Sequence, residues 1–340
     1  MDYADYVDYL VNAPIARTVR DRRDPIDIYS DSEFRERFGF TKDSVLSLLE
    51  MIGPYLEHAT DRNFALSPRL QLLCSLRIFR TGIYQLVAGD LINVHRTTAG
   101  RAFDAVINGL LALAPLYIAM PNTRQQCNAK KRAFYRLGGF PNVIGAIDGS
   151  HFRILCPPGN HNELFRNRKG FFSINAQIIC DADMIITNVV SRWPGSTHDA
   201  RIWDNSTVAA RFEAGEYGGL LVGDSGYALS PSLMTPLLQP RTQGERRYNR
   251  AHILTRNIVE RTFGVLKKRF QILQKEMRFH PTKCGNIIVA SCVLHNFGID
   301  VGDVYQVDEV IAENAPYHVE VVEERGNLVR RALILNYFSH

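Results

Sequence analysis

Paired cysteines are missing from this sequence. Its six cysteines are scattered over 340 residues, and none of them forms a Cys-x-x-Cys pair with another. The spacing gives no indication of a zinc site or a disulfide framework, so free thiols in a reducing compartment are expected. The six are Cys74, Cys127, Cys156, Cys180, Cys284 and Cys292.

Long hydrophobic runs are missing as well. No apolar stretch approaches the roughly 20 residues of a membrane span, and the acidic beginning, Met-Asp-Tyr-Ala-Asp-Tyr, does not resemble a signal peptide. An intracellular protein without membrane contact is therefore expected. The apolar share of 46% and the charged share of 22% are ordinary for a globular protein, and 340 residues suffice for more than one folded unit.

A large net charge is also absent, since the total is only +5, but the charges are unevenly distributed. Basic residues crowd the stretch 241–278, and acidic residues crowd the C-terminal tail. This segregation favours a surface that faces a polyanion, although a solvated helix face with ion pairs is an alternative. The tail acids are Asp303, Asp308, Glu309, Glu313, Glu320, Glu323 and Glu324.

The first part of the chain, residues 1–135, is predicted to be helical because its apolar residues recur at helical spacing. Residues 68–106 could contain a helix-turn-helix, with 84–90 as the first helix and a recognition helix that begins at His95. A plain helical bundle gives the same spacing, so packing without DNA contact is the alternative. The candidate DNA contacts in this part are Arg96 and Arg101.

From residue 141 the hydrophobic pattern becomes that of strands. Apolar runs predict strands at 143–155, 173–180, 185–191 and 220–223, with a short fifth strand near 234–238. Helices are expected at 196–213, 251–273 and 284–297. The alternation predicts an α/β unit over 141–298, followed by an acidic C-terminal extension over 299–340.

Two aspartates each follow an apolar run that is predicted to be a strand. Asp148 would share a strand face with Ala146 and Phe152, where a carboxylate is costly unless it meets a cation or an edge. Asp224 closes its run at the kind of strand end where sheet proteins commonly present ligands. Both also allow a plainer interpretation, since Asp-Gly at 148 and Asp-Ser-Gly at 224 are typical turn sequences.

Glu260 and Asp199 are the other candidate acids. Glu260 follows Val259 and so borders the apolar stripe of a long helix, but Arg256, four residues earlier, makes a surface ion pair an equally natural interpretation. Asp199 lies in the first turn of a predicted helix, where the helix dipole alone favours an anion. A metal-binding role for Asp199 is the alternative to that structural one.

Together the acids occur in the order strand-Asp148, strand-Asp224, helix-Glu260. Carboxylate oxygens are the ligands that Mg²⁺ and Mn²⁺ prefer, and two such ions can drive phosphodiester hydrolysis by activating water and stabilising the leaving 3′ oxygen. Lysine and arginine side chains nearby would hold flanking phosphates. The candidates for that role are Arg166, Arg168, Lys169, Arg256, Lys267 and Lys268, of which the loop residues 166–169 could equally be solvated.

With these residues on the page, the chain resembles the PIF/Harbinger-type DDE transposase family, and most closely the host-domesticated Harbinger transposase-derived nucleases of animals. The resemblance covers roughly residues 141–298 and rests on blocks that occur in order. They are Gly145-Ala-Ile-Asp148-Gly-Ser-His151, Asn167-Arg-Lys-Gly-Phe-Phe-Ser-Ile-Asn175, Pro194-Gly-Ser-Thr-His-Asp199-Ala-Arg201, Gly223-Asp224-Ser-Gly-Tyr227, Asn257-Ile-Val-Glu260-Arg-Thr-Phe-Gly264 and Val293-Leu-His-Asn-Phe297.

The resemblance implies an RNase H-like, retroviral integrase-like fold for residues 141–298. It implies Asp148, Asp224 and Glu260 as catalytic acids, with Asp199 as a further metal ligand and Mg²⁺ or Mn²⁺ as the cofactor. It also implies DNA as substrate, a Myb-like DNA-binding partner protein and a nuclear location, possibly shared with the cytoplasm. It does not imply transposition, which domesticated members are thought to have lost.

The leading hypothesis is thus a metal-dependent DNA endonuclease. A DNA-binding or scaffold protein that keeps the fold without catalysis is the second hypothesis. An enzyme of the same fold that acts on another phosphate ester is the third. The sequence leaves the oligomeric state open, and a homodimer is compatible with it.

Overall fold

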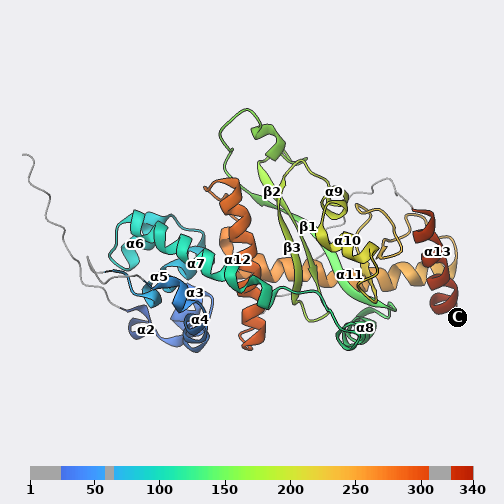
Figure 1. Cartoon of the computed structure of the whole chain (residues 1–340), viewed down its shortest axis with the longest axis horizontal. Helices are drawn as coiled ribbons and strands as arrows, with labels where there is room; N and C mark the ends of the chain where they lie inside the picture. Colours follow the sequence, from blue (N-terminus) through green and yellow to red (C-terminus); the bar gives the residue numbers. More distant parts are fainter. Residues whose placement is uncertain (1–23, 58–64, 306–322, 340) are drawn as a thin grey trace, which may run out of the picture.

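A computed structural model describes residues 24–57, 65–305 and 323–339. Within them the chain forms one five-stranded mixed sheet flanked by many helices (Figure 1). The expectation of a mixed α/β protein is therefore confirmed. The helices of residues 25–117 lie toward one end of the molecule, and the sheet, the helix over 124–138 and the C-terminal helix lie toward the other (Figure 1).

The first part of the described chain is helical, and each long helix begins at a polar capping residue. The Thr41 hydroxyl accepts a hydrogen bond from the Ser44 amide, and Ser67 does the same for Leu70, with Pro68 at the first helical position. These side chains satisfy backbone donors that a helix leaves unpaired. The helices are α2 (Pro25–Ile28), α3 (Asp31–Phe38), α4 (Lys42–Leu56), α5 (Pro68–Thr81), α6 (Gln85–Leu91), α7 (Arg96–Tyr117) and α8 (Arg124–Gly138).

Helix α7 is 22 residues long, and by length and apolar composition alone it could cross a membrane. The sequence predicts a helix that begins at His95, but not one with the length and apolar composition of a membrane span. In the fold its buried side, which includes Phe103, Val106 and Leu110, packs against α4, α5 and α12. That packing is the packing of a core helix, and it accounts for the apolar composition.

The strands run β1 (Val143–Arg153), β2 (Ser173–Cys180), β3 (Ile186–Pro194), β4 (Leu220–Val222) and β5 (Leu233–Met234). Their order in the sheet is β3-β2-β1-β4-β5. The first three strands form an antiparallel meander, whereas β4 pairs parallel to β1 and β5 parallel to β4. A short 3₁₀ helix, η1 (Asn162–Phe165), lies in the connection between β1 and β2.

Strand β1 runs without interruption through Asp148 and Gly149, which pair with Ile178 and Gln177 of β2. The interpretation of Asp148-Gly149 as a hairpin turn is therefore wrong. A two-residue turn would end the strand there, but the ladder to β2 continues through Arg153.

The helix expected over 196–213 is two helices, α9 (Asp199–Asp204) and α10 (Thr207–Glu213). They separate because Ser206 caps α10, with its hydroxyl accepting from the Ala209 amide and donating to the Trp203 carbonyl. A side chain that satisfies the backbone in this way ends one helix and begins the next. Strand β5 is also shorter than expected, since it comprises only Leu233–Met234.

Helix α11 (Gln243–Arg269) begins earlier than predicted because Thr242 and Glu245 form a capping box. It crosses the sheet behind β1 and β2 (Figure 1). A 3₁₀ turn, η2 (Gln271–Leu273), follows it, and α12 (Pro281–Asp300) comes next. The chain ends with α13 (Glu324–Leu333) and the π-helical turn η3 (Ile334–Phe338), which packs on α11.

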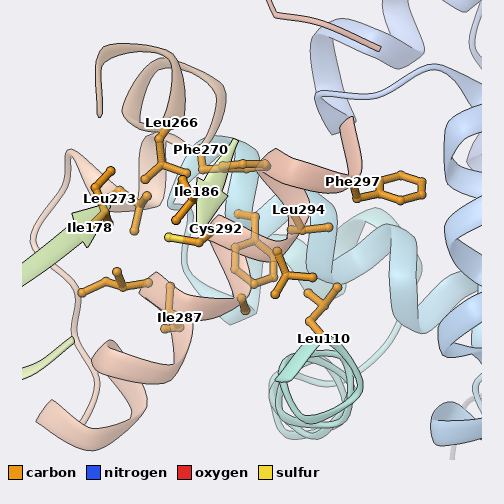
Figure 2. Close-up of a cluster of buried hydrophobic side chains, with 14 of the residues drawn as sticks. Leu110, Ile178, Ile186, Leu266, Phe270, Leu273, Ile287, Cys292, Leu294 and Phe297 are labelled. Atoms are coloured by element: carbon orange, nitrogen blue, oxygen red, sulfur yellow. The ribbon is translucent and has the colours of Figure 1, made fainter. Parts of the chain in front are cut away.

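Helix α12 joins the helical half to the sheet. Figure 2 shows its side chains Ile287, Cys292, Leu294 and Phe297 gathered with Ile178 and Ile186 of the sheet, Leu266 and Phe270 of α11 and its continuation, and Leu110 of α7. All of these side chains are buried. A single apolar core therefore runs from the N-terminal helices to this face of the sheet.

A second, smaller core covers the opposite face of the sheet. It contains Ile147, Ile179 and Leu221 from the strands, packed against Trp203 and Phe212 of α9 and α10. Because side chains alternate along a strand, the even-numbered positions of β1 from Ala146 face α11 and the odd-numbered ones face α9.

The first acid of the C-terminal tail is not solvated. Asp303 is buried and forms ion pairs with Arg35 (2.8 Å) and the buried Arg269 (3.4 Å), and its carboxylate accepts the Thr41 amide (2.8 Å). It thereby connects the segment after α12 to the N-terminal helices. The tail acids Asp308, Glu309, Glu313 and Glu320 lie outside the described residues.

Candidate active site

Asp148 lies in the middle of β1 and points toward α11. It shares this side with Ala146, Ser150 and Phe152, and its side chain is only 16% exposed. One carboxylate oxygen accepts the Gly149 amide (2.8 Å). A carboxylate so little exposed needs compensating charge, and α11 supplies it.

Asp224 stands beside Asp148 because β1 and β4 are parallel. Ala146 pairs with Val222, and each aspartate lies two residues beyond its member of that pair. The strand β4 ends at Val222, and the Asp224 carboxylate accepts the Gly226 amide (2.9 Å) in the loop that follows. Asp224 is thus both a turn residue and a carboxylate at the strand end, so the two interpretations of this segment are compatible.

Glu260 reaches Asp148 through an arginine. From α11, the Nη1 of Arg256 lies 3.5 Å from the Asp148 carboxylate, and its Nη2 donates to the Glu260 carboxylate. The three side chains are 15–17% exposed. The ion pair expected between Arg256 and Glu260 is present, but it faces the sheet instead of the solvent, and it includes a third partner from β1.

Asp199 lies on the other side of β1. An added Cβ on Gly149 would come within 2.3 Å of its carboxylate, and the Asn175 amide donates to the same oxygen (2.7 Å). Gly149 and Asn175 are odd-numbered positions on the face toward α9, so the β1 backbone separates Asp199 from Glu260. Only a glycine at 149 lets the Asp199 carboxylate lie this close to the strand.

Burial raises the pKa of Asp148 to about 8, and the neighbouring Asp224 and Asp199 add to the shift, while Arg256 opposes it. Burial also raises the pKa of Asp199, against the Asn175 hydrogen bond. The two shifts share a cause, since negative charge is concentrated here in a site with little solvent. Perturbed carboxylates in one place are typical of functional sites.

The raised pKa of Asp148 predicts that the protein without metal loses stability as the pH rises. The unfolded chain releases this proton near 3.8 and the folded protein near 8. The folded state therefore binds more protons between these values, and the free energy of unfolding falls with increasing pH there. Urea unfolding between about pH 5 and 8 would measure the slope, and Asp148→Asn is expected to flatten it. An identical slope in the variant would contradict the assignment.

The donor chemistry of the site fits a hard divalent cation, because its acids offer carboxylate oxygens, and the negative charges of Asp224 and Asp199 act on Asp148. Within the described parts of the chain, however, no three His, Cys, Asp or Glu side chains are grouped closely enough to hold a metal ion. The guanidinium of Arg256 lies between Asp148 and Glu260. Asp148, Asp224 and Glu260 are the residues that could share an ion if it left.

Lys267 is the basic candidate that the fold brings into the site. Its Nζ donates to the Ser150 hydroxyl (2.6 Å) and lies over the Phe152 ring (4.9 Å). Burial lowers its pKa to about 8, although Asp148 opposes the shift. Its neighbour Lys268 is exposed at the end of α11.

The other basic candidates lie in two separate places. Arg166 is held in the loop after η1 by Glu163 (2.7 Å) and the Gly170 carbonyl (3.0 Å), while Arg168 and Lys169 are exposed next to it. Burial lowers the pKa of the half-buried His151 to about 4, and the charges of Arg168 and Lys169 contribute to this shift. Arg96 and Arg101 are exposed on α7 in the helical half, where α6 and α7 form the expected pair of helices.

Two buried polar residues of β2 were not singled out individually from the sequence. Asn175 holds Asp199, and Gln177 accepts the hydroxyl of the buried Tyr227 (3.2 Å). A signal for them exists, because they are polar at alternate positions of an otherwise apolar strand, which indicates one polar stretch on one face. Tyr227 belongs to the Gly-Asp-Ser-Gly-Tyr segment that carries Asp224.

Comparison with known proteins identifies the family of this chain. Residues 147–296 match the family of DDE superfamily endonucleases. The chain is 34% identical to "Putative nuclease HARBI1" of Mus musculus over 326 residues, and equally to the protein of that name from Homo sapiens over 325 residues. Each alignment covers 92% of this chain and 93% of the relative.

More distant similarity extends to plants. The chain is 26% identical to "Protein ALP1-like" of Arabidopsis thaliana over 259 residues, covering 70% of this chain and 62% of that protein. No solved structure matches this chain. The matched family range begins one residue before Asp148 and ends within α12, so it contains all four candidate acids.

Proposed function

Because the chain belongs to the family of Harbinger transposase-derived nucleases, we propose that it is a metal-dependent DNA endonuclease with an RNase H-like core. One observation carries the proposal. Asp148 of β1 and Asp224, just beyond the end of the adjacent parallel strand β4, stand side by side, and α11 brings Glu260 to the same place through Arg256. The sheet order, with an antiparallel meander next to two parallel strands, supports the RNase H-like part of the proposal.

In this mechanism Asp148, Asp224 and Glu260 would hold the divalent metal, Mg²⁺ or Mn²⁺. Bound ions supply Lewis-acid activation of water and of the phosphodiester. The sheet fixes the first two carboxylates, since Asp148 lies within β1 and Asp224 lies two residues beyond the buried strand β4. The contacts of Asp199 support a role in fixing β1 beside Asp148, and they do not support its sharing an ion with Glu260.

The basic residues around the site would hold the DNA. Lys267 donates to Ser150, and the charge of Asp148 acts on its ammonium group. Lys268, Arg168 and Lys169 are exposed at the surface. Phosphates on either side of the cleaved bond are the ligands that such residues attract. Arg96 and Arg101 on α7 remain proposed contacts for a more distant part of the duplex.

The family also supports a cellular setting as a proposal. A protein of this origin would meet its DNA in the nucleus, with a cytoplasmic pool possible before import. A Myb-like partner protein would supply sequence recognition, and the exposed side chains Tyr84, Leu86 and Val87 at the start of α6 offer an apolar surface in the helical half. A homodimer is the further assembly that the proposal allows.

A nicking assay tests the proposed activity directly. Purified protein with Mn²⁺ or Mg²⁺ is expected to convert supercoiled DNA to the open circle and to leave 3′-hydroxyl ends that a polymerase extends. A chelator should stop the reaction, and activity across a gel-filtration peak should follow the protein, which excludes a contaminant. No nicking with any divalent metal, together with salt-dependent binding of DNA, would favour the scaffold hypothesis instead.

A further inference from the structure

The least expected feature of the site is the position of Arg256. Its two terminal nitrogens face different acids, with Nη1 toward Asp148 and Nη2 toward Glu260. Asp148 belongs to β1 and Glu260 to α11, so the guanidinium links an acid of the sheet to an acid of the helix. A guanidinium is suited to this link because it is planar, always charged and able to serve two carboxylates at once.

This link and a shared metal ion exclude each other. Mg²⁺ requires its oxygen ligands at about 2.0 to 2.1 Å, so two carboxylates on one ion leave no room for a guanidinium between them. The charge conflicts too, because a divalent cation and an arginine at the same carboxylates repel each other. The carboxylates can serve one cation or the other.

The surroundings hold Arg256 where it is. The side chain is 15% exposed, and the acids that it contacts are about as little exposed, so solvent weakens these ion pairs only in part. Arg261, which follows Glu260 on the same helix, is exposed and forms no ion pair with another described residue. The two arginines carry the same charge on one helix, and only Arg256 is directed at the acids.

We propose that Arg256 is the resident counter-ion of the acidic site, and that a divalent metal binds Asp148 and Glu260 only by displacing this guanidinium. The arginine acts as a positioning residue: it holds the metal-free acids together and sets the concentration of metal that the site requires. The inference rests on the proposed metal-binding role of these acids, but it concerns metal binding without DNA and so is independent of cleavage.

The test is a calorimetric titration of Mn²⁺ into the full-length protein without DNA. Arg256→Gln removes the competing charge and is expected to bind Mn²⁺ at least tenfold more tightly than the wild type. Arg261→Gln removes the same charge from the same helix, away from the acids, and is expected to stay within twofold of the wild type. Arg256→Gln combined with Asp148→Asn should lose the gain, which locates the ion at these acids.

Thermal unfolding with and without Mn²⁺ is a second measurement, for the case in which Arg256→Gln folds poorly without metal. In thermal unfolding, Mn²⁺ should stabilise Arg256→Gln more than the wild type, because at a given concentration a ligand that binds the folded state more tightly stabilises it more. Arg256→Lys keeps the charge but offers one nitrogen in place of two, so its affinity for Mn²⁺ should fall between those of Arg256→Gln and the wild type.

Several outcomes would overturn the inference. Equal or weaker Mn²⁺ binding by Arg256→Gln would show that the guanidinium does not compete with the ion. An equal gain in Mn²⁺ affinity for Arg261→Gln would show that only the net charge matters. An affinity of Arg256→Lys equal to that of the wild type would show that the contact of one guanidinium with two acids does not matter. If the wild type never cleaves DNA but these titrations behave as expected, the proposed activity fails and the inference stands.

Discussion

Replacing Asp224 with asparagine is expected to lower DNA nicking by about a thousandfold, which corresponds to about 4 kcal/mol of lost transition-state stabilisation. The reason is that Asp224 stands next to Asp148, just beyond the end of the neighbouring parallel strand, where both carboxylates would hold one ion. Asparagine keeps the shape and can still accept the Gly226 amide, so the loop after β4 should survive. Initial nicking rates with Mn²⁺, and circular dichroism for the fold, are the measurements.

Asp183→Asn provides the matched control. Asp183 lies exposed in the turn between β2 and β3, and it carries the same charge within the same family match. Its replacement should leave the nicking rate within about twofold, since surface changes away from special features have small effects. Full activity in Asp224→Asn would remove Asp224 from the catalytic acids, whatever the behaviour of Asp148.

Replacing Arg269 with methionine is expected to destabilise the protein by about 3 to 5 kcal/mol. The Arg269 side chain is buried at the end of α11, where it donates to the carbonyls of Gly39 (3.1 Å) and Asp303 (2.8 Å) and stacks 3.9 Å from the centre of the Phe40 ring. Its loss removes these contacts and leaves Asp303 with Arg35 as its only remaining ion-pair partner among the described residues. Urea unfolding measures the loss.

Two further variants separate the causes. Arg269→Met combined with Asp303→Asn should recover part of the loss, because the second change removes the poorly compensated carboxylate. Arg261→Met, at an exposed position of the same helix, should change the free energy of unfolding by less than about 0.5 kcal/mol. A cost below about 1 kcal/mol for Arg269→Met would mean that the burial of this arginine contributes little.

Local patterns made much of the sheet predictable. The strand at 173–180 has the predicted bounds, and the predicted runs at 143 and 220 coincide with β1 and β4 within a few residues, because apolar alternation and flanking turn residues are local properties. The order strand-Asp148, strand-Asp224, helix-Glu260 grouped the three acids, and the resemblance to a known family implied their catalytic role. The family itself is borne out by the comparisons.

Long-range placement was not predictable. The pair of Arg256 and Glu260 follows from helix spacing, but its third partner, Asp148, is 108 residues away in sequence, and only packing of α11 on β1 brings it there. The side of the sheet on which Asp199 lies depends on the register between β1 and β2. The burial of Asp303 depends on an arginine at the far end of α11, so an acidic tail composition could not indicate it.

The length of α11 has a mechanical consequence. Its 27 residues form one uninterrupted helix of about 40 Å. At its C-terminal end, Arg80 donates to the Lys268 and Arg269 carbonyls. Near its N-terminal end, Arg247 donates to the carbonyl of Phe338 in the C-terminal turn. Glu260 and Arg256 ride near its middle. A protein that binds the N-terminal helices would therefore also act on the C-terminal end of α11. A small tilt of α11 caused by such binding would move Glu260 and Arg256 relative to Asp148, although the bound protein would not contact these residues.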